Sequence, residues 1–178
     1  MKSSKTCMSP IGAVSRGLLA GVAGTVAMDF WQYVLYRRAG GKERLTQWEF
    51  SSDVKDWTDA PAPAQVGRRV VEGLFARKLP DERAALVNNV THWAYGVSSA
   101  AAYGVLAGSL RRPRAAYGLV VGPTVWLAGY VVLPAAGLYK PIWEYDAATL
   151  SKDLLAHVVY GLSTGTVFSA LVPRRTQR

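Results

Sequence analysis

The chain has 178 residues, of which 50% are hydrophobic and only 19% are charged, and its formal net charge is +9. A single cysteine, Cys7, excludes a disulfide framework and a cysteine-ligated metal site built within this chain. No nucleic-acid-binding motif accompanies the basic charge, so we expect no nucleic-acid partner. Nucleophile elbows, phosphate-binding loops and H-E-x-x-H are also absent, which favours a non-enzymatic protein with no catalytic residues.

Almost all charged residues fall outside four long apolar stretches, at residues 12–36, 86–110, 115–139 and 153–172. A bilayer core about 30 Å thick needs about 20 apolar residues of helix to cross it. A soluble fold of this length has no core thick enough for four such helices. We therefore predict an all-α integral membrane protein, a single membrane domain over residues 1–178, in which four transmembrane helices form a bundle.

The loop at residues 37–83 is the one long segment outside the predicted spans. After an Ala-Pro-Ala-Pro-Ala stretch at 60–64, apolar residues recur at helical spacing with charged residues between them. This pattern predicts an amphipathic helix over about 64–78. The helix either rests on the membrane surface or covers the ends of the spans as a lid, because periodicity does not identify the partner of an apolar face.

The net positive charge lies on one side of the predicted bundle. Four spans bring the N-terminus, the turn after residue 110 and the C-terminus together, and these segments carry cations and no acid: Lys2, Lys5, Arg16, Arg111, Arg112, Arg114, Arg174, Arg175 and Arg178. By the positive-inside rule both termini are cytoplasmic and the loop at 37–83 is extracytoplasmic. Arg37 and Arg38, beside the first span, count against this orientation.

Two motifs of the form H-x-x-Y-G begin at His92 and His157, align at an offset of 65 residues and contain both histidines of the chain. A weaker G-x-x-x-G match relates residues 17–21 to 118–122. We predict two parallel copies of a helical hairpin, related by a pseudo-two-fold axis along the membrane normal. Small residues let helices pack closely in lipid, and the predicted packing residues are Gly17, Gly21, Gly96, Gly118, Gly122, Gly161 and Gly165.

Polar side chains from all four spans fall at a similar depth, as a layer made of Asp29, His92, Tyr95, Tyr130, Asp153, His157 and Tyr160. Asp29 is the strongest signal, since a carboxylate inside a span costs about 2.5–3.5 kcal/mol on insertion scales unless it is paired or hydrated. The layer predicts a site that handles protons or a ligand. The alternative is a structural clamp whose members only satisfy one another.

The two histidines leave two cofactor alternatives open. His92 and His157 lie on separate spans and could ligate a b-type haem from both sides, which would make the chain an electron carrier. Together with Asp29 they could instead bind a non-haem metal. A single histidine pair, with nothing in the chain that indicates a redox partner, favours a protein without a cofactor.

A longer order of motifs runs through residues 12–172. The glycine-rich stretch 17–29 ends in Asp29, the first H-x-x-Y-G follows, then Leu133-Pro134-x-x-Gly137-Leu138, and then the second H-x-x-Y-G. This order resembles the YagU-like bacterial inner-membrane proteins. The resemblance implies a multi-pass helical protein of the bacterial cytoplasmic membrane, but that family is essentially uncharacterised and transfers no catalytic residue.

These observations together predict a small accessory or stress-related membrane protein in which Asp29, His92 and His157 respond to protons. The alternatives are the haem-binding electron carrier and a small transporter that works as an oligomer. The expected partners are the lipid bilayer and either another membrane protein or a second copy of this chain.

Overall fold

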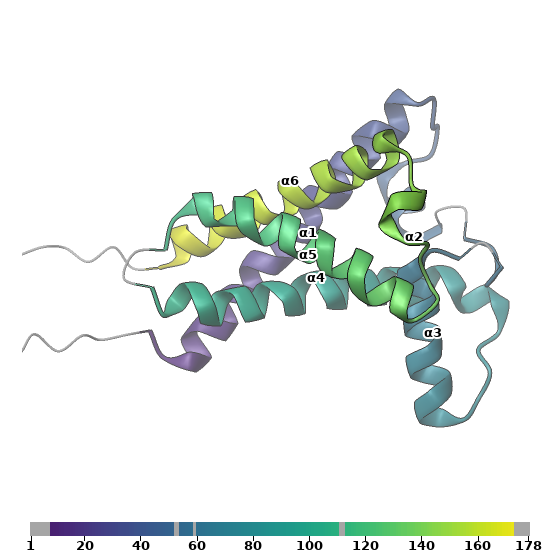
Figure 1. Ribbon diagram of the computed structural model, residues 1–178, viewed down its shortest axis with the longest axis horizontal. Coiled ribbons are helices and arrows are strands. Elements are labelled where there is room, and N and C mark those ends of the chain that lie inside the picture. The colour runs from purple at the N-terminus through teal and green to yellow at the C-terminus, as the bar shows by residue number, and fades with distance from the viewer. Residues whose placement is uncertain (1–7, 52–53, 59, 111–112, 173–178) are drawn as a thin grey trace, which may run out of the picture.

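The computed structural model describes residues 8–51, 54–58, 60–110 and 113–172 and is helical, with no β-strand in these ranges (Figure 1). The predicted all-α class is confirmed. The α-helices are α1 Pro10–Arg38, α2 Leu45–Ser51, α3 Ala62–Phe75, α4 Ala84–Gly108, α5 Gly118–Ala135 and α6 Ala147–Leu171. Short 3₁₀ turns, η1 Asp81–Arg83, η2 Ala115–Tyr117 and η3 Ile142–Glu144, precede α4, α5 and α6.

In the described part of the chain, three helical stretches are long and apolar enough to cross a membrane: Pro10–Arg38, Ala115–Ala135 and Ala147–Leu171. The fourth predicted stretch, α4, has 25 residues and none of them is charged. Its first half carries Asn88, Asn89, Thr91 and His92, however, and these polar residues lower its mean hydropathy.

Two helices end at glycines that adopt a left-handed backbone. Gly40, with φ of 96°, follows α1, and Gly137, with φ of 66°, follows α5. In both turns the N–H groups of the glycine and of the residue after it donate to carbonyls near the end of the helix, which is the Schellman pattern. After α5, for example, Gly137 donates to Pro134 and Leu138 donates to Leu133. This turn ends α5 at Ala135, four residues before the predicted end of the span at 139.

The first turn of α6 lies outside the predicted span of 153–172, because Asp146 caps the helix. Its carboxylate accepts hydrogen bonds from the backbone N–H of Thr149 at 2.9 Å and from the Thr149 hydroxyl at 2.6 Å. The charged residues Lys152 and Asp153 therefore lie inside the helix. The predicted span began at residue 153 and so left Lys152 out, because its start was placed where the charged residues end. The amphipathic helix expected at about 64–78 is α3, at Ala62–Phe75.

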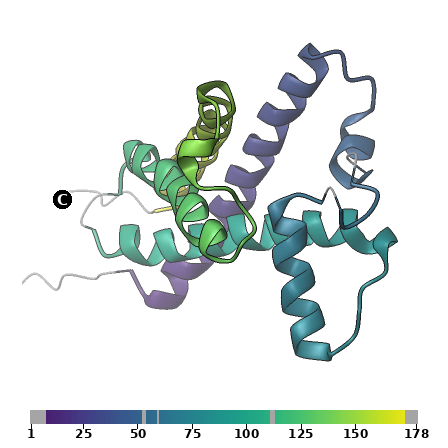
Figure 2. The ribbon, with the colours of Figure 1, turned by 45° about the vertical axis from the view of Figure 1, so that its right-hand side comes forward.

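The four long helices run along the long axis of the molecule, and α3 lies across them (Figure 1). α1 packs against both α4 and α6, and α6 packs against α5, while α4 and α5 make no extensive contact within the described residues. The helices therefore form an open row in the order α4, α1, α6, α5. Figure 2 shows α1 crossing α4 near the start of α1 and rising away from it toward the other end.

The open row differs from the two-fold arrangement expected from the sequence. Such an axis would exchange α1 with α5 and α4 with α6, so the contact between α1 and α6 would require an equal one between α5 and α4. The two hairpins, α1 with α4 and α5 with α6, do pack as pairs. The structure thus has one of the two contacts that would join them, and a space remains where the second would be.

Glycines lie at the closest approaches between the long helices. A methyl group added to Gly118 or Gly122 would overlap the backbone of α6, and one added to Gly161 or Gly165 would overlap the backbone at the start of α5. Gly17 and Gly21 face the backbone of α4 in the same way, and Gly96 faces the side chain of Thr25. All seven predicted packing glycines lie at contacts between helices, as expected where backbone contact must hold helices together in lipid.

The side-chain distribution is the reverse of that in a soluble protein. Among the described residues the fully buried positions are mostly small or polar, such as Ala20, Ala100, Thr25 and Thr164. Large apolar side chains point outward instead. Leu106 on α4 is 70% exposed and Val120 on α5 is 67% exposed.

α3 has features of both expected arrangements, lid and surface helix. Its buried residues are the small Ala62, Ala64 and Gly67, which face α4, and Arg69 donates a hydrogen bond to the carbonyl of Ala136 after α5. α3 therefore bridges α4 and α5 at one end of the row. Val66 lines the space between the long helices, whereas Val70, Leu74 and Phe75 are exposed, with Leu74 75% exposed.

The start of α1, the turn between α4 and α5 and the end of α6 share one end of the molecule (Figure 1). Arg16 ties two of these segments together, because its Nε donates to the carbonyl of Leu171 at 3.0 Å. Arg16 and Arg114 are the described members of the predicted basic side. The others, and Cys7, lie outside the described residues: Lys2, Lys5, Arg111, Arg112, Arg174, Arg175 and Arg178.

Candidate functional site

A cavity of about 510 Å³ is lined by all four long helices and, at one end, by α2 and α3. Its walls include α4 and α5, the two helices that do not pack against each other. The seven residues of the predicted polar layer all line it: Asp29, His92, Tyr95, Tyr130, Asp153, His157 and Tyr160. The cavity therefore lies where a symmetric bundle would have its second inter-hairpin contact.

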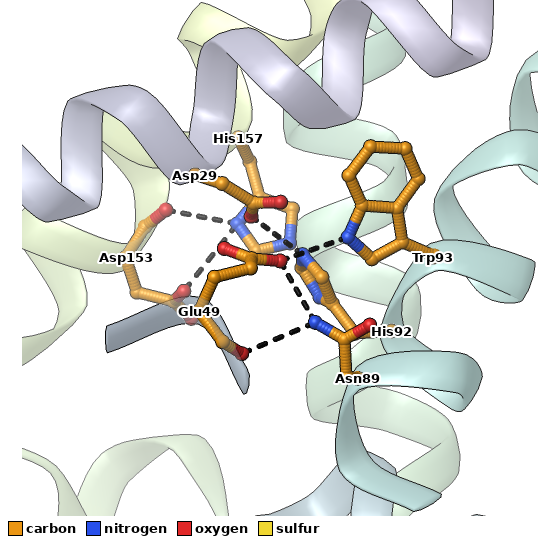
Figure 3. Close-up of polar contacts among 7 residues, drawn as sticks. All are labelled: Asp29, Glu49, Asn89, His92, Trp93, Asp153 and His157. Atoms are coloured by element: carbon orange, nitrogen blue, oxygen red, sulfur yellow. Dashed lines mark hydrogen bonds and ion pairs between the residues drawn. The ribbon is translucent and has the colours of Figure 1, made fainter. Parts of the chain in front are cut away.

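Asp29 and His92 form a pair between α1 and α4, in which the carboxylate is buried and the imidazole is partly buried (Figure 3). The Oδ1 atom of Asp29 lies 2.9 Å from Nε2 of His92, and Asp29 as a whole is only 6% exposed. Gly21 on α1 and Gly96 on α4 allow these two helices to approach closely, two turns before Asp29 and one turn after His92. Buried charges of this kind need a partner, and the imidazole supplies one.

His157 has a different environment, although it is the sequence counterpart of His92. Its Nδ1 lies 2.9 Å from the backbone carbonyl and 3.4 Å from Oδ1 of Asp153, one turn earlier on α6. The hydroxyl of Tyr130 on α5 donates to Oδ2 of the same aspartate at 3.1 Å. Asp153 thus connects α5 and α6, while the ring of His157 is held by its own helix.

The tyrosines of the two H-x-x-Y-G motifs also make different contacts. The Tyr160 hydroxyl donates to the carbonyl of Gly96 at 2.6 Å and so links α6 to α4. The Tyr95 hydroxyl donates to the carbonyl of Val125 on α5 at 3.4 Å. The two copies of the motif line one cavity but are not equivalent in it.

Glu49, on α2, is a residue of the site that the sequence analysis missed. Its carboxylate accepts hydrogen bonds from the side chains of Asn89 at 2.8 Å and Trp93 at 3.0 Å, both on α4 (Figure 3). It was missed because residues 37–63 were treated as a loop without helix. The one available signal is the stretch Leu45-Thr-Gln-Trp-Glu-Phe, which is compatible with a short helix.

Four buried polar atoms that belong to cavity-lining residues have no hydrogen-bond partner in the described structure. They are Oγ1 of Thr25, Oδ2 of Asp29, Oδ1 of Asn88 and Nε1 of Trp126. Buried polar groups are normally satisfied, by protein or by ordered molecules, because leaving them bare costs about 1–3 kcal/mol each. A cavity with four such atoms is suited to hold polar molecules.

The charges around the cavity are of one sign. Three carboxylates line it, those of Asp29, Glu49 and Asp153, and no described Lys or Arg does. The ion pair between Arg68 and Glu72, on α3, is the one salt bridge of a Lys or Arg found among the described residues, and neither partner lines the cavity. Only the imidazoles are available to balance the three carboxylates.

The residues proposed for a non-haem metal are not gathered into one set of ligands. In the part of the chain that the structure describes, no group of three His, Cys, Asp or Glu side chains is placed to hold a metal ion. Asp29 contacts His92, whereas His157 is bonded to Asp153.

Comparisons with protein families, with curated proteins and with solved structures found no match for this chain.

Proposed function

We propose that this chain is a four-span protein of the bacterial cytoplasmic membrane, with both termini inside, whose Asp29–His92 pair responds to protons. The observation that carries the proposal is the state of Asp29. Oδ1 of Asp29 lies within hydrogen-bond distance of His92, Oδ2 has no partner in the described structure, and Asp29 lines the cavity between the long helices. In this proposal the chain is an accessory or stress-related protein and not an enzyme.

The outward-facing apolar side chains support four spans. Each long helix exposes large apolar residues, among them Leu19 on α1, Leu106 on α4, Val120 on α5 and Leu155 on α6. Such surface is stable in lipid but is a liability in water. α4 has 25 residues and is about 38 Å long at 1.5 Å per residue, so it is long enough to cross a core of about 30 Å.

The polar face of α4 is compatible with a span because it turns inward. Asn88, Asn89 and His92 all line the cavity or contact residues that do, and Val90 on the opposite face is 57% exposed. Polar residues within spans characteristically face the interior of the protein or a water-filled cavity. The repeated H-x-x-Y-G motif, the glycine-lined hairpins and the resemblance to the YagU-like proteins support two duplicated hairpins in the same membrane.

The proton response follows from the chemistry of the pair. A carboxylate with a neutral imidazole carries one negative charge, and uptake of one proton by the pair removes it, wherever the proton resides. In a medium of low dielectric constant this change alters the forces on all nearby groups. The titratable groups that share the cavity with the pair are Glu49 from α2, Tyr95 from α4, Tyr130 from α5, Tyr139 after α5, and Asp153, His157 and Tyr160 from α6.

Tryptophan fluorescence in lipid nanodiscs tests this proposal, because Trp93 and Trp126 lie beside the site. We expect the emission of the ligand-free protein to change with pH between about 5 and 8, the range in which histidines titrate. Asp29→Asn should abolish that change. Asp81→Asn, a matched substitution at an exposed position before α4, should retain it, and equal pH responses in the two variants would contradict the proposal.

A further inference from the structure

We infer that the cavity binds an organic ammonium ion that carries at least one N–H group and an apolar body. The inference names a ligand for the cavity of the proposed function, and it rests on that proposal only in requiring that Asp29 remain in the interior of a membrane-embedded bundle.

The sign of the ligand follows from the lining. Asp29, Glu49 and Asp153 bring three carboxylates to one space, and no described Lys or Arg lines it or pairs with any of them. An anionic ligand would be repelled, and a neutral one would leave the carboxylates uncompensated in a medium of low dielectric constant. A cation compensates them.

Two buried oxygen atoms without a hydrogen-bond donor indicate that the ligand must carry N–H groups. Oδ2 of Asp29 and Oδ1 of Asn88 are buried acceptors without a donor in the described structure. An ammonium group with N–H bonds can donate to them, whereas a quaternary ammonium cannot. His92 has a positioning role here, since it holds Oδ1 of Asp29 and leaves Oδ2 for the ligand.

The remaining lining accommodates an apolar body. Six aromatic residues line the cavity: Trp48, Tyr95, Trp126, Tyr130, Tyr139 and Tyr160. Aromatic faces attract cations, most strongly where water is excluded, and they pack against aliphatic or aromatic groups. The volume of about 510 Å³ lies within the range of about 300–1,000 Å³ that is typical of small-molecule sites. A metal ion is a poorer candidate, because the described residues contain no group of three ligating side chains.

Calorimetry on the full chain in nanodiscs of zwitterionic lipid tests the inference with four probes of similar size. These are 2-phenylethylamine, its N,N,N-trimethyl derivative, 2-phenylethanol and 3-phenylpropionate. At pH 7.5 we expect saturable binding of the amine, binding about tenfold weaker or more for the quaternary ion and the alcohol, and none for the carboxylate, as expected for loss of a charged hydrogen bond. Asp29→Asn should weaken amine binding by about tenfold, and Asp81→Asn should leave it unchanged.

Three results would overturn the inference: no saturable binding of the amine, equal binding of the amine and the alcohol, or full affinity in a folded Asp29→Asn variant. If Asp29→Asn does not fold, Glu49→Gln takes its place in the test. Glu49 lies on α2, outside the long helices, so its replacement disturbs their packing less, and its carboxylate also lines the cavity. We expect Glu49→Gln to weaken amine binding by about threefold, because the variant removes a negative charge from the lining without removing the bare acceptor of Asp29. Unchanged affinity would count against the inference. If the amine fails to bind while ligand-free fluorescence still depends on pH and Asp29, the inference fails and the proposed function stands.

Discussion

The two carboxylate oxygens of Asp29 have different environments. Oδ1 meets the imidazole of His92, and Oδ2 meets no described partner. A charged residue in an otherwise apolar stretch is visible in the sequence, so Asp29 and its inward orientation were predictable. The choice of partner was not, because both histidines occur in the same motif and only the packing of α1 against α4 places His92, and not His157, beside the carboxylate.

Replacing His92 tests the value of the pair. His92→Ala leaves a buried carboxylate without its partner, and we expect a loss of about 3–5 kcal/mol in the free energy of unfolding, as is usual for breaking a buried pair. Titration with a denaturing detergent measures this free energy, and we expect Asp29→Asn to restore part of the loss in the double variant.

The control is His157→Ala, which removes a ring bonded only within its own helix. We expect this variant to lose less stability than His92→Ala. If the losses caused by Asp29→Asn and His92→Ala are strictly additive, the two side chains are not coupled.

Glu72 provides a pH-dependent contact outside the long helices. The backbone N–H of Leu79 at 2.8 Å and the guanidinium of Arg68 at 3.1 Å both bond to its carboxylate, and these hydrogen bonds lower the pKa of Glu72 below its ordinary value of 4.5. The folded pKa is the lower one, so the stabilisation is fully present above the unfolded pKa and is lost as the pH falls through the folded pKa.

Hydrogen exchange at the Leu79 amide measures this effect. We expect its protection factor to be constant from neutral pH down to about 4.5 and to fall at more acidic pH. Glu72→Gln should lower the protection at neutral pH and remove the acid dependence. An acid dependence that persists in Glu72→Gln would assign the effect to another group.

At the scale of the helices, glycine contacts decide the packing. The helix pair α5 and α6 approaches so closely that a methyl group on Gly122 would overlap the carbonyl oxygen of His157. Gly122→Ala should therefore destabilise the protein by about 1–3 kcal/mol, the usual cost of overpacking. Gly73→Ala is the matched control, since a methyl group there meets nothing within 4 Å. Alanine favours a helix over glycine by up to about 1 kcal/mol, so this variant should be as stable as the parent or slightly more stable.

Detergent titration of both variants, with circular dichroism to follow helix content, checks this prediction. A Gly122→Ala protein as stable as the parent would show that α5 and α6 can separate without cost. Closest approach at Gly122 would then not be what holds the second hairpin together.

The helices themselves were largely predictable, and their ends were less so. Long stretches with few or no charged residues predict α1, α4, α5 and α6, because a span needs about 20 predominantly apolar residues. The end of α5 depends on Gly137, and the start of α6 on the cap formed by Asp146. Both are local turn geometries that a count of charges does not detect. α2 was not predicted, because a helix of seven residues is too short to show a repeating pattern of apolar residues.

At the scale of the whole molecule, the main difference from the expected arrangement is the loss of symmetry. A repeated sequence favours repeated contacts, yet Tyr95 bonds to α5 and Tyr160 bonds to α4. The contact between α1 and α6 has no counterpart between α4 and α5, and α2 and α3 cover one end of the resulting space. These two helices belong to the long loop, which has no second copy in the chain, so the repeat alone could not predict the cavity.

The distribution of side chains across the molecule supports the same account. Among the described residues, small residues and Asp29 are buried, and each of the four long helices exposes leucine side chains, such as Leu19, Leu106, Leu119 and Leu155. In water this arrangement would expose an apolar surface around the whole row, and in lipid it is the stable one. In a membrane, the Asp29–His92 pair is an ionisable site among apolar surroundings, which is where such groups cost most.

Nitrogen NMR of the imidazole rings in nanodiscs tests that central feature most directly, because the chain has only two histidines and His157→Ala assigns them. We predict that the ring signals of His92 change with pH and that Asp29→Asn alters both their positions and the midpoint of the change. The same substitution should leave the ring signals of His157 where they are in the parent protein. If Asp29→Asn leaves the His92 ring signals and their midpoint unaltered, the two side chains do not share a proton and the account is contradicted.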